Sequence, residues 1–285
     1  MAPVECTPPD KTPAKVLYDA HNHLQDPRLS RARDTLWADL DREGLAKMVV
    51  NGTHPSDWPA VAAWAAACPD RIIPSYGVHP WELPRAPSHW PELLQQQLDQ
   101  QPAAVGETGL DRWKEGLPWD GQVEAFRLHL QFAAARNRPV SIHCLRAWGA
   151  CAEQLEQGPV PACGVLLHSY GGSAEMADRL AKCGAYFSFC GAFAHPRYAR
   201  IQAVFKQLPL DRILMETDAP DQLPPGEWRR YSLKDESGRT ANHPANIGAV
   251  YAFFAKLRAL ALPVLQAQVA ENFNRLFGPI HSAAR

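Results

Sequence analysis

The chain has 285 residues, of which 46% are hydrophobic and 21% are charged, and its formal net charge is −1. These values are typical of a globular protein and argue against a disordered chain. The near-zero net charge excludes a global electrostatic field that would attract nucleic acid, so any polyanion binding has to come from local patches.

Cysteine usage and hydropathy bear on where the protein resides. The seven cysteines are odd in number, irregularly spaced and include no Cys-x-x-Cys, which favours reduced thiols in a cytoplasmic protein over a disulfide framework. No apolar run approaches the ~20 residues of a membrane span, so we expect no membrane association, and no obligate protein partner is evident. Residues 1–15 contain four prolines and no apolar signal core, and we expect them to form a flexible tail.

After this tail, apolar runs rich in strand formers alternate with helical patterns. The expected strands are 16–18, 46–50, 72–76, 103–105, 140–142, 164–167, 185–189 and 213–215. The expected helices are 32–43, 58–67, 91–101, 121–136, 146–157, 173–182, 196–207, 244–260 and 263–277.

Eight such strands, each too apolar to face water on one side, predict an α/β fold of the TIM-type (β/α)8 barrel class. We expect residues 16–285 to form this single barrel domain. An open doubly wound sheet is the structural alternative. It loses support because no Gly-x-Gly-x-x-Gly follows the first strand and no P-loop is present.

The first strand leads into Asp-Ala-His-Asn-His at positions 19–23. Residues i and i+2 of a strand point to the same face, so His21 and His23 are expected to present two imidazoles side by side. Two neutral imidazoles at this spacing can bind a divalent metal. The alternative is one hydrogen-bonded core histidine beside one loop histidine.

Further histidines and carboxylates follow other strands, and in a parallel barrel these strand ends carry the chemistry. Six candidate metal ligands fall at the ends of five strands: His21, His23, Glu107, His143, His168 and Asp218. Six ligands exceed what one tetrahedral zinc ion needs and suit two ions about 3.5–4 Å apart. The mixture of nitrogen and oxygen ligands fits Mg, Mn or Zn without choosing among them.

Several motifs in a fixed order carry a resemblance to a known family. They are Asp-Ala-His-Asn-His (19–23), Gly-Val-His-Pro (77–80), Gly-Glu-Thr-Gly-Leu-Asp (106–111), Ser-Ile-His-Cys (141–144), His-Ser-Tyr-Gly-Gly-Ser (168–173), Glu-Thr-Asp-Ala-Pro (216–220) and Asn-Phe-Asn-Arg-Leu-Phe (272–277). In this order the chain resembles the TatD family of metal-dependent hydrolases and DNases over residues 16–277.

The resemblance implies a TIM-type barrel with a two-metal site. It implies that the first metal is held by His21, His23, Glu107 and Asp218, and the second by Glu107, His143 and His168, with Glu107 bridging. Asp218 and Glu107 would be the catalytic residues, and Asp218 would orient or deprotonate the attacking water. His79, Asp111 and Arg146 match positions where substrate binding is expected.

The sequence departs from the family pattern at three places. Arg112 and Trp113 replace a pair of aromatics, the segment after His143 reads Cys-Leu-Arg-Ala-Trp, and residues 242–246 read Asn-His-Pro-Ala-Asn. These departures leave the six ligands intact and indicate a distinct branch with its own substrate.

The expected function is hydrolysis of DNA or another phosphodiester by a water that two divalent ions activate, most simply as a 3′–5′ exonuclease. One alternative is an amidohydrolase or deacylase on the same metal pair, including one that acts on acylated nucleic acid. A basic pocket near Arg112 and Arg146 would favour the phosphodiesterase, and an apolar pocket walled by Trp81 and Trp113 would favour the deacylase. A non-enzymatic interaction protein that retains the barrel is the remaining alternative.

The segment Trp-Arg-Arg-Tyr at 228–231 follows the last predicted strand. Aromatic side chains interleaved with arginines can stack on bases and hold phosphates, so this loop is a candidate contact for single-stranded DNA. The alternative is a solvated surface loop.

Overall fold

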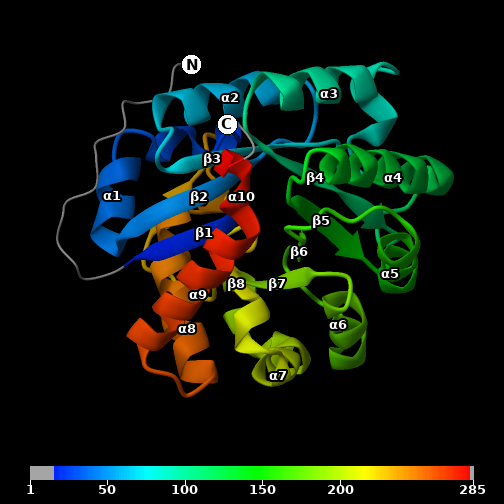
Figure 1. The fold of residues 1–285 in the computed structure, drawn as a ribbon. Helices are drawn as coiled ribbons and strands as arrows, with labels where there is room; N and C mark the ends of the chain where they lie inside the picture. Colours follow the sequence, from blue (N-terminus) through cyan, green and yellow to red (C-terminus); the bar gives the residue numbers. More distant parts are fainter. Residues whose placement is uncertain (1–15, 283–285) are drawn as a thin grey trace. The chain divides into compact units, whose positions relative to one another are not determined.

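The computed structural model describes residues 16–282, and the predicted flexible tail at 1–15 lies outside them. Eight parallel strands follow one another in a single sheet in the order β1 to β8 (Figure 1). They are β1 Leu17–Asn22, β2 Leu45–Asn51, β3 Ile72–Tyr76, β4 Ala104–Asp111, β5 Val140–Leu145, β6 Val165–Leu167, β7 Ala185–Cys190 and β8 Ile213–Glu216.

The end of β8 meets the end of β1. The backbone N–H of Asp218 donates to the carbonyl oxygen of His21 at 2.9 Å, and the N–H of His23 donates to that of Ala219 at 2.8 Å. The strands, alternating with helices, therefore form a nearly closed barrel. This confirms the predicted (β/α)8 fold class.

The helices follow the predicted order with shifted ends. They are α1 Leu36–Glu43, α2 Trp58–Ala67, α3 Trp90–Gln100, α4 Trp119–Ala135, α5 Trp148–Gln157, α6 Ala174–Ala181, α7 Ala199–Gln207, α8 Ile247–Leu257, α9 Leu262–Phe277 and the short α10 Pro279–Ser282. The helix expected at 32–43 is shorter, because a separate 3₁₀ segment, Pro27–Ala32, precedes it. No single described helix is long and apolar enough to cross a membrane. Only a pair of segments taken together has the length and apolar composition of a span. These are Pro244–Leu257 and Leu262–Phe277, which meet at a bend of 112°.

Two predicted helix boundaries have clear physical causes. Gly44 ends α1 in the left-handed conformation, with φ of 78°, which glycine adopts without a Cβ penalty. The Ser173 hydroxyl accepts a hydrogen bond from the N–H of Met176 at 3.2 Å and so caps the start of α6.

Strands β4 and β5 run further than the apolar pattern suggests. In the sheet Gly109 pairs with His143, and Asp111 pairs with Leu145. A Cβ built on Gly109 would lie only 1.9 Å from the carbonyl oxygen of His143, so glycine is what lets the two strands approach there. Several candidate site residues therefore lie on the strands themselves rather than on loops behind them.

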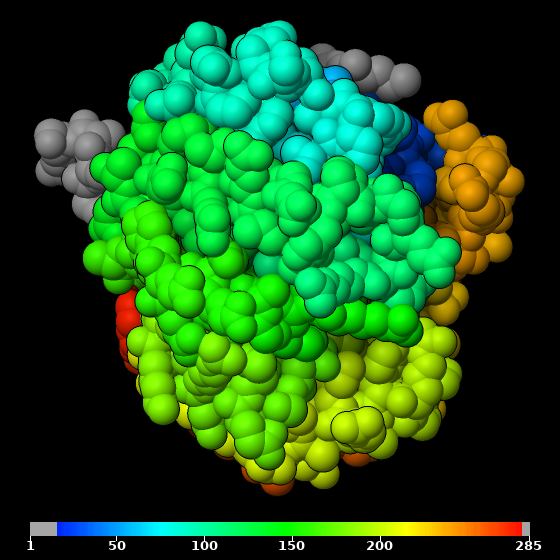
Figure 2. All heavy atoms as spheres, turned by 90° about the vertical axis from the view of Figure 1, so that its right-hand side faces the viewer, coloured from blue at the N-terminus to red at the C-terminus, as the bar shows by residue number. Residues whose placement is uncertain are grey.

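The chain packs into two compact units. The first comprises residues 16–50, 62–73 and 188–273, and its core includes the mutually packed rings of Phe189, Phe205 and Phe254. The second comprises residues 51–61, 74–187 and 274–282, with fully buried Phe126 and Phe187 in its core. The outer surface of the second unit around α4 to α6 is unbroken (green in Figure 2).

A two-stranded antiparallel hairpin in the first unit was not expected from the sequence. It consists of β9 Ser232–Lys234 and β10 Thr240–Asn242. The Asp235 carboxylate accepts hydrogen bonds from the Ser237 hydroxyl at 2.7 Å and from the Arg239 N–H at 2.9 Å, which stabilises the turn. Strands of three residues give no readable alternation, but the Asp-Glu-Ser-Gly turn is a local signal for such a hairpin.

Candidate metal centre

The first compact unit holds a cluster of two histidines and one carboxylate. His21 and His23 come from the end of β1, and Asp218 follows β8. The Nε2 atoms of the two histidines lie 3.3 Å apart, so the imidazoles expected from their spacing do lie side by side. Asp218 Oδ1 lies 3.6 Å from His21 Nε2 and 3.4 Å from His23 Nε2.

A buried hydrogen-bond network fixes the backbone below this cluster. Asp19 Oδ1 accepts the N–H of Thr217 at 3.0 Å, and Asp19 Oδ2 accepts the Thr217 hydroxyl at 2.6 Å. The Asn242 side-chain amide donates to the carbonyl oxygen of Thr217 at 2.9 Å. Burial raises the pKa of Asp19 to about 7, although the hydrogen bonds from Thr217 lower it. The network ties β1 to β8 and thereby sets the position of His21 and Asp218.

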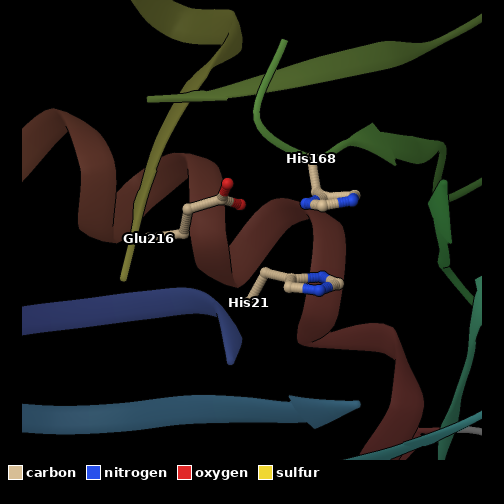
Figure 3. A group of neighbouring side chains, drawn as sticks. All are labelled: His21, His168 and Glu216. Carbon is tan, nitrogen blue, oxygen red and sulfur yellow. The ribbon is translucent and has the colours of Figure 1, made fainter. Parts of the chain in front are cut away.

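Glu216 and Asp218 lie on the same segment but differ in their surroundings. Figure 3 shows Glu216 on β8 and His21 at the end of β1, with both side chains extending to the same side of these two strands. Glu216 is fully buried and accepts a hydrogen bond from the Ser188 hydroxyl at 2.5 Å. Asp218 has a φ of 49°. Backbone strain of this kind at a non-glycine residue is concentrated at functional sites.

The second compact unit holds a cluster centred on Glu107 of β4. Its Oε1 atom lies 3.3 Å from His79 Nε2, 3.2 Å from His143 Nδ1 and 2.9 Å from His168 Nε2. His143 Nδ1 and His168 Nε2 lie 3.4 Å apart. All four side chains are buried. His79, which the resemblance assigns to substrate binding, thus lies nearly as close to Glu107 as His143 does.

The position of Glu107 depends on close backbone contacts. Its N–H donates to the carbonyl oxygen of Gly52 at 2.8 Å. The Ser75 hydroxyl donates to the carbonyl oxygen of Gly106 at 2.9 Å. A Cβ on Gly77 would lie 2.7 Å from the Glu107 carbonyl oxygen, so the glycine of Gly-Val-His-Pro allows β3 to approach β4.

Two histidines around Glu107 differ in the direction of their pKa shifts. Burial lowers the pKa of His79 to about 4, although the Glu107 carboxylate raises it. For His143 burial also lowers the pKa, but the hydrogen bonds with Asp111 and Glu107 outweigh it and the net shift is upward. A histidine must be neutral to bind a metal, so His79 is in the required form at neutral pH.

Asp111, at the end of β4, orients His143 from the side opposite Glu107. Its Oδ2 atom lies 2.9 Å from His143 Nε2 and accepts the Trp81 indole N–H at 2.8 Å. Its Oδ1 atom accepts the backbone N–H groups of Trp113 at 2.6 Å and Lys114 at 2.9 Å. Burial alone would raise the pKa of Asp111, but these hydrogen bonds hold it well below its usual range. Carboxylates that hold a ligating histidine in this way orient the imidazole in many metal sites.

The two remaining expectations concern exposed side chains. Arg146 follows β5, is exposed and has a φ of 54°, and its contact with substrate stays a prediction. Arg112 is also exposed, and its guanidinium lies 3.8 Å above the ring of Trp119. The basic pocket considered for these two arginines stays a prediction.

The segment 228–231 is attached to its own unit rather than free for nucleic acid. Arg230 Nη1 donates to Glu43 Oε2 at 2.9 Å, and the Tyr231 hydroxyl donates to Glu43 Oε1 at 3.1 Å. The Asn246 side-chain oxygen accepts hydrogen bonds from the backbone N–H groups of Arg230 at 3.0 Å and Tyr231 at 2.9 Å. The Trp228 ring packs edge-on against Phe253 at 5.1 Å. These contacts attach the segment to its own unit and pair the Arg230 guanidinium with Glu43, so a role in binding phosphate stays a prediction.

The donor atoms in each cluster have the spacing of a metal's ligand shell. Ligand atoms 2.0–2.1 Å from a tetrahedral ion lie about 3.3–3.4 Å from one another. The three distances are 3.3, 3.4 and 3.6 Å among His21, His23 and Asp218. They are 2.9, 3.2 and 3.4 Å among Glu107, His143 and His168. Most of these distances exceed those of ordinary hydrogen bonds, and the donor types suit Zn, Mn or Mg. Each cluster fits one divalent ion.

Comparisons with known proteins agree with this geometry. The family model described as TatD related DNase matches residues 18–278. The uncharacterized metal-dependent hydrolase YjjV of Escherichia coli K12 is 28% identical over 265 residues, covering 91% of this chain and 96% of that protein. Its crystal structure superimposes with a TM-score of 0.83 over 92% of this chain and 98% of YjjV, at 26% identity.

Two further relatives extend the comparison. The 3′-5′ ssDNA/RNA exonuclease TatD of Dickeya dadantii is 27% identical over 92% of this chain and 98% of its own length. A TatD family hydrolase from Entamoeba histolytica, at 18% identity and a TM-score of 0.78 over 93% of this chain and 99% of its own, shows the same fold. The matched family model, the relatives and the two donor clusters lead to one conclusion: the chain belongs to the TatD family of metal-dependent hydrolases.

Proposed function

We propose that this hydrolase cleaves phosphodiester bonds of single-stranded nucleic acid from the 3′ end, with one divalent ion in each donor cluster. The observation that carries the proposal is the ligand-shell spacing in both clusters. The resemblance implies that both ions serve one reaction, and we propose the same role for the two clusters. The relatives named as 3′-5′ ssDNA/RNA exonucleases support the choice of substrate.

The side chains have distinct roles in this proposal. The divalent ions, when bound, polarise the phosphodiester and acidify the attacking water. His21 and His23 would hold one ion, His143 and His168 would hold the other, and Glu107 is the carboxylate that the resemblance assigns to both. Asp218 accepts the proton of the attacking water. Asp111 keeps the His143 ring in place.

The proposal also covers the cellular setting and the identity of the ions. Seven cysteines without Cys-x-x-Cys support a cytoplasmic enzyme. Imidazole and carboxylate donors support Mg, Mn or Zn. Single-stranded DNA is the proposed substrate partner.

Metal content and product pattern test the proposal together. We expect about two ions per purified chain, and stepwise shortening of a 5′-labelled oligonucleotide that a 3′-terminal block prevents. Glu107→Gln should lower the metal content. Asp218→Asn, loaded with metal, should lower turnover by about 100-fold or more. Glu124→Gln, which changes an exposed carboxylate on α4, is the matched control and should leave both unchanged.

The possible results separate the alternatives. Two bound ions with intact DNA would reject the nuclease and direct the search to amide and ester substrates. Wild-type turnover in metal-loaded Asp218→Asn would reject the role of Asp218. A purified protein without metal that hydrolyses nothing would support an interaction protein that retains the barrel.

A further inference from the structure

Two tryptophans of the second unit form an exposed aromatic surface beside the Glu107 cluster. The rings of Trp81 and Trp113 stack with centroids 6.1 Å apart and planes inclined by 27°. Trp113 is 53% exposed, and it is the only aromatic among the four large exposed hydrophobic residues in the described part of the chain. An exposed indole stacked on a second one offers a flat aromatic face to a ring-bearing ligand.

The tryptophan pair is linked directly to the candidate metal ligands. The Trp81 ring lies 6.1 Å from the ring of His143 and 5.3 Å from that of His79, edge-on in both cases. Asp111 accepts the Trp81 indole N–H and also contacts His143. If a substrate ring stacks on Trp113, only the Trp113 indole separates it from Trp81, whose ring contacts His79 and His143.

Packing explains Trp81 but not Trp113. Trp81 is partly buried and its indole N–H is satisfied by Asp111. Trp113 leaves more than half of its surface in water, yet its backbone is fixed by the hydrogen bond of its N–H to Asp111 at 2.6 Å. A rigidly held, exposed indole offers a large contact area with little loss of conformational entropy on binding.

The charges around the pair suit a ring that carries a phosphate. The ammonium group of Lys114 lies 4.6 Å above the ring of Trp81. Arg112 precedes Trp113 in the sequence and is exposed, with its guanidinium 3.8 Å above the ring of Trp119. Glu115, also exposed, follows Lys114, so residues 112–115 carry two positive charges and one negative charge. Flanking cations and a free aromatic face are the features with which proteins bind single-stranded nucleic acid.

We propose that Trp113, supported by Trp81, is a stacking platform that binds a flat aromatic ring of the substrate. In a nucleic acid this ring is the base at the cleaved end. The inference rests on the proposed function and names the part of the substrate that the site recognises. Stacking tolerates any base, so the platform selects a base-bearing end rather than a sequence.

Oligonucleotides with and without a 3′-terminal base test the inference. Wild-type enzyme should cleave a normal 3′ end with a KM roughly tenfold lower than that for an abasic 3′ end, which corresponds to the loss of one stacked base. Trp113→Ala should remove this preference by raising KM for the normal end, with kcat on the abasic end unchanged. Trp113→Phe, which keeps a ring, should retain most of the preference.

A control variant and a binding assay exclude a merely structural role. Val264→Ala removes a side chain of α9 that is 54% exposed and should leave the preference unchanged. In metal-free protein, a phosphorothioate oligonucleotide should quench tryptophan fluorescence in the wild type and less so in Trp113→Phe. A preference that survives in Trp113→Ala, or an equal loss of kcat on both ends, would overturn the platform.

The outcomes separate this inference from the proposed function. DNA cleavage that ignores the terminal base would overturn the platform and leave the nuclease intact. If the wild type cleaves no nucleic acid, the proposed nuclease function is wrong. The platform is then tested with two esters of equal size, of which only the aryl ester carries a ring. A preference for aryl esters that Trp113→Ala abolishes would support the platform, and equal rates on both esters would overturn it.

Discussion

The buried imidazole of His129 in α4 predicts a specific loss of stability in acid. Its Nδ1–H donates to the carbonyl oxygen of Ala125 at 2.7 Å, and its Nε2 accepts the N–H of Val78 at 3.0 Å. The ring also stacks on Trp90 at 4.8 Å. Protonation would turn the acceptor Nε2 into a donor and place it against the donor N–H of Val78.

The size and sign of the effect follow from the pKa. Burial lowers the pKa of His129 from 6.5 to about 4. The unfolded chain therefore takes up a proton at higher pH than the folded protein does, so stability is complete above about pH 6.5 and falls as the pH drops toward 4. For this pair of pKa values the loss at pH 4.5 is about 2.5 kcal/mol.

Urea unfolding of metal-free protein at pH 7.0 and pH 4.5 measures this loss. His129→Gln, which cannot titrate, should lose less stability between the two pH values than the wild type, by about 2.5 kcal/mol. Other acid-sensitive groups titrate in both proteins and cancel in the difference. Equal losses in wild type and variant would refute the reasoning.

Three further variants test particular contacts. Asp111→Asn should weaken metal binding about 10–100-fold by releasing the ring of His143, measured by metal titration of the apoprotein. Gly109→Ala should lower the free energy of unfolding by at least about 2 kcal/mol, because φ is 146° and the Cβ would lie 1.9 Å from a carbonyl oxygen. Gly116 has a φ of 78° and open space around it, so Gly116→Ala should lower the free energy of unfolding by only about 1 kcal/mol. Thermal unfolding of both variants measures the difference. Arg230→Ala should leave the salt dependence of single-stranded DNA binding unchanged, and should cost no more than about 1 kcal/mol in urea unfolding, because its side chain is 43% exposed.

The sequence contained enough information for the barrel but not for the ends of its strands. Apolar runs such as 72–76 and 185–189 are buried on both faces and stand out from their surroundings. The last residues of β4 do not stand out as a strand. Gly106 and Gly109 allow neighbouring backbone to approach closely, and Glu107 and Asp111 are polar residues of the candidate site. Local strand signals are lost where function and close packing determine the residue type.

The candidate site was predictable where position along a strand was enough. The spacing of His21 and His23 predicted that their rings lie side by side, and the other candidate ligands were chosen by their place after apolar runs. The contact between His79 and Glu107 could not be predicted from the sequence, because it depends on the register of two strands. The pairing of Arg230 with Glu43 joins residues 187 positions apart, and nothing local in the sequence signals it.

Asp111 makes two different kinds of hydrogen bond to the tryptophan pair, and the difference bears on the proposed platform. It holds Trp113 through a backbone N–H, which any residue except proline would supply at that position. It holds Trp81 through the indole N–H, which the side chain alone supplies. The side chain at position 113 can therefore change without disturbing His143, whereas a change at position 81 removes a hydrogen bond from the carboxylate that orients it. This is a physical reason why the departures from the family pattern at Arg112 and Trp113 can alter the substrate while the metal ligands stay in place.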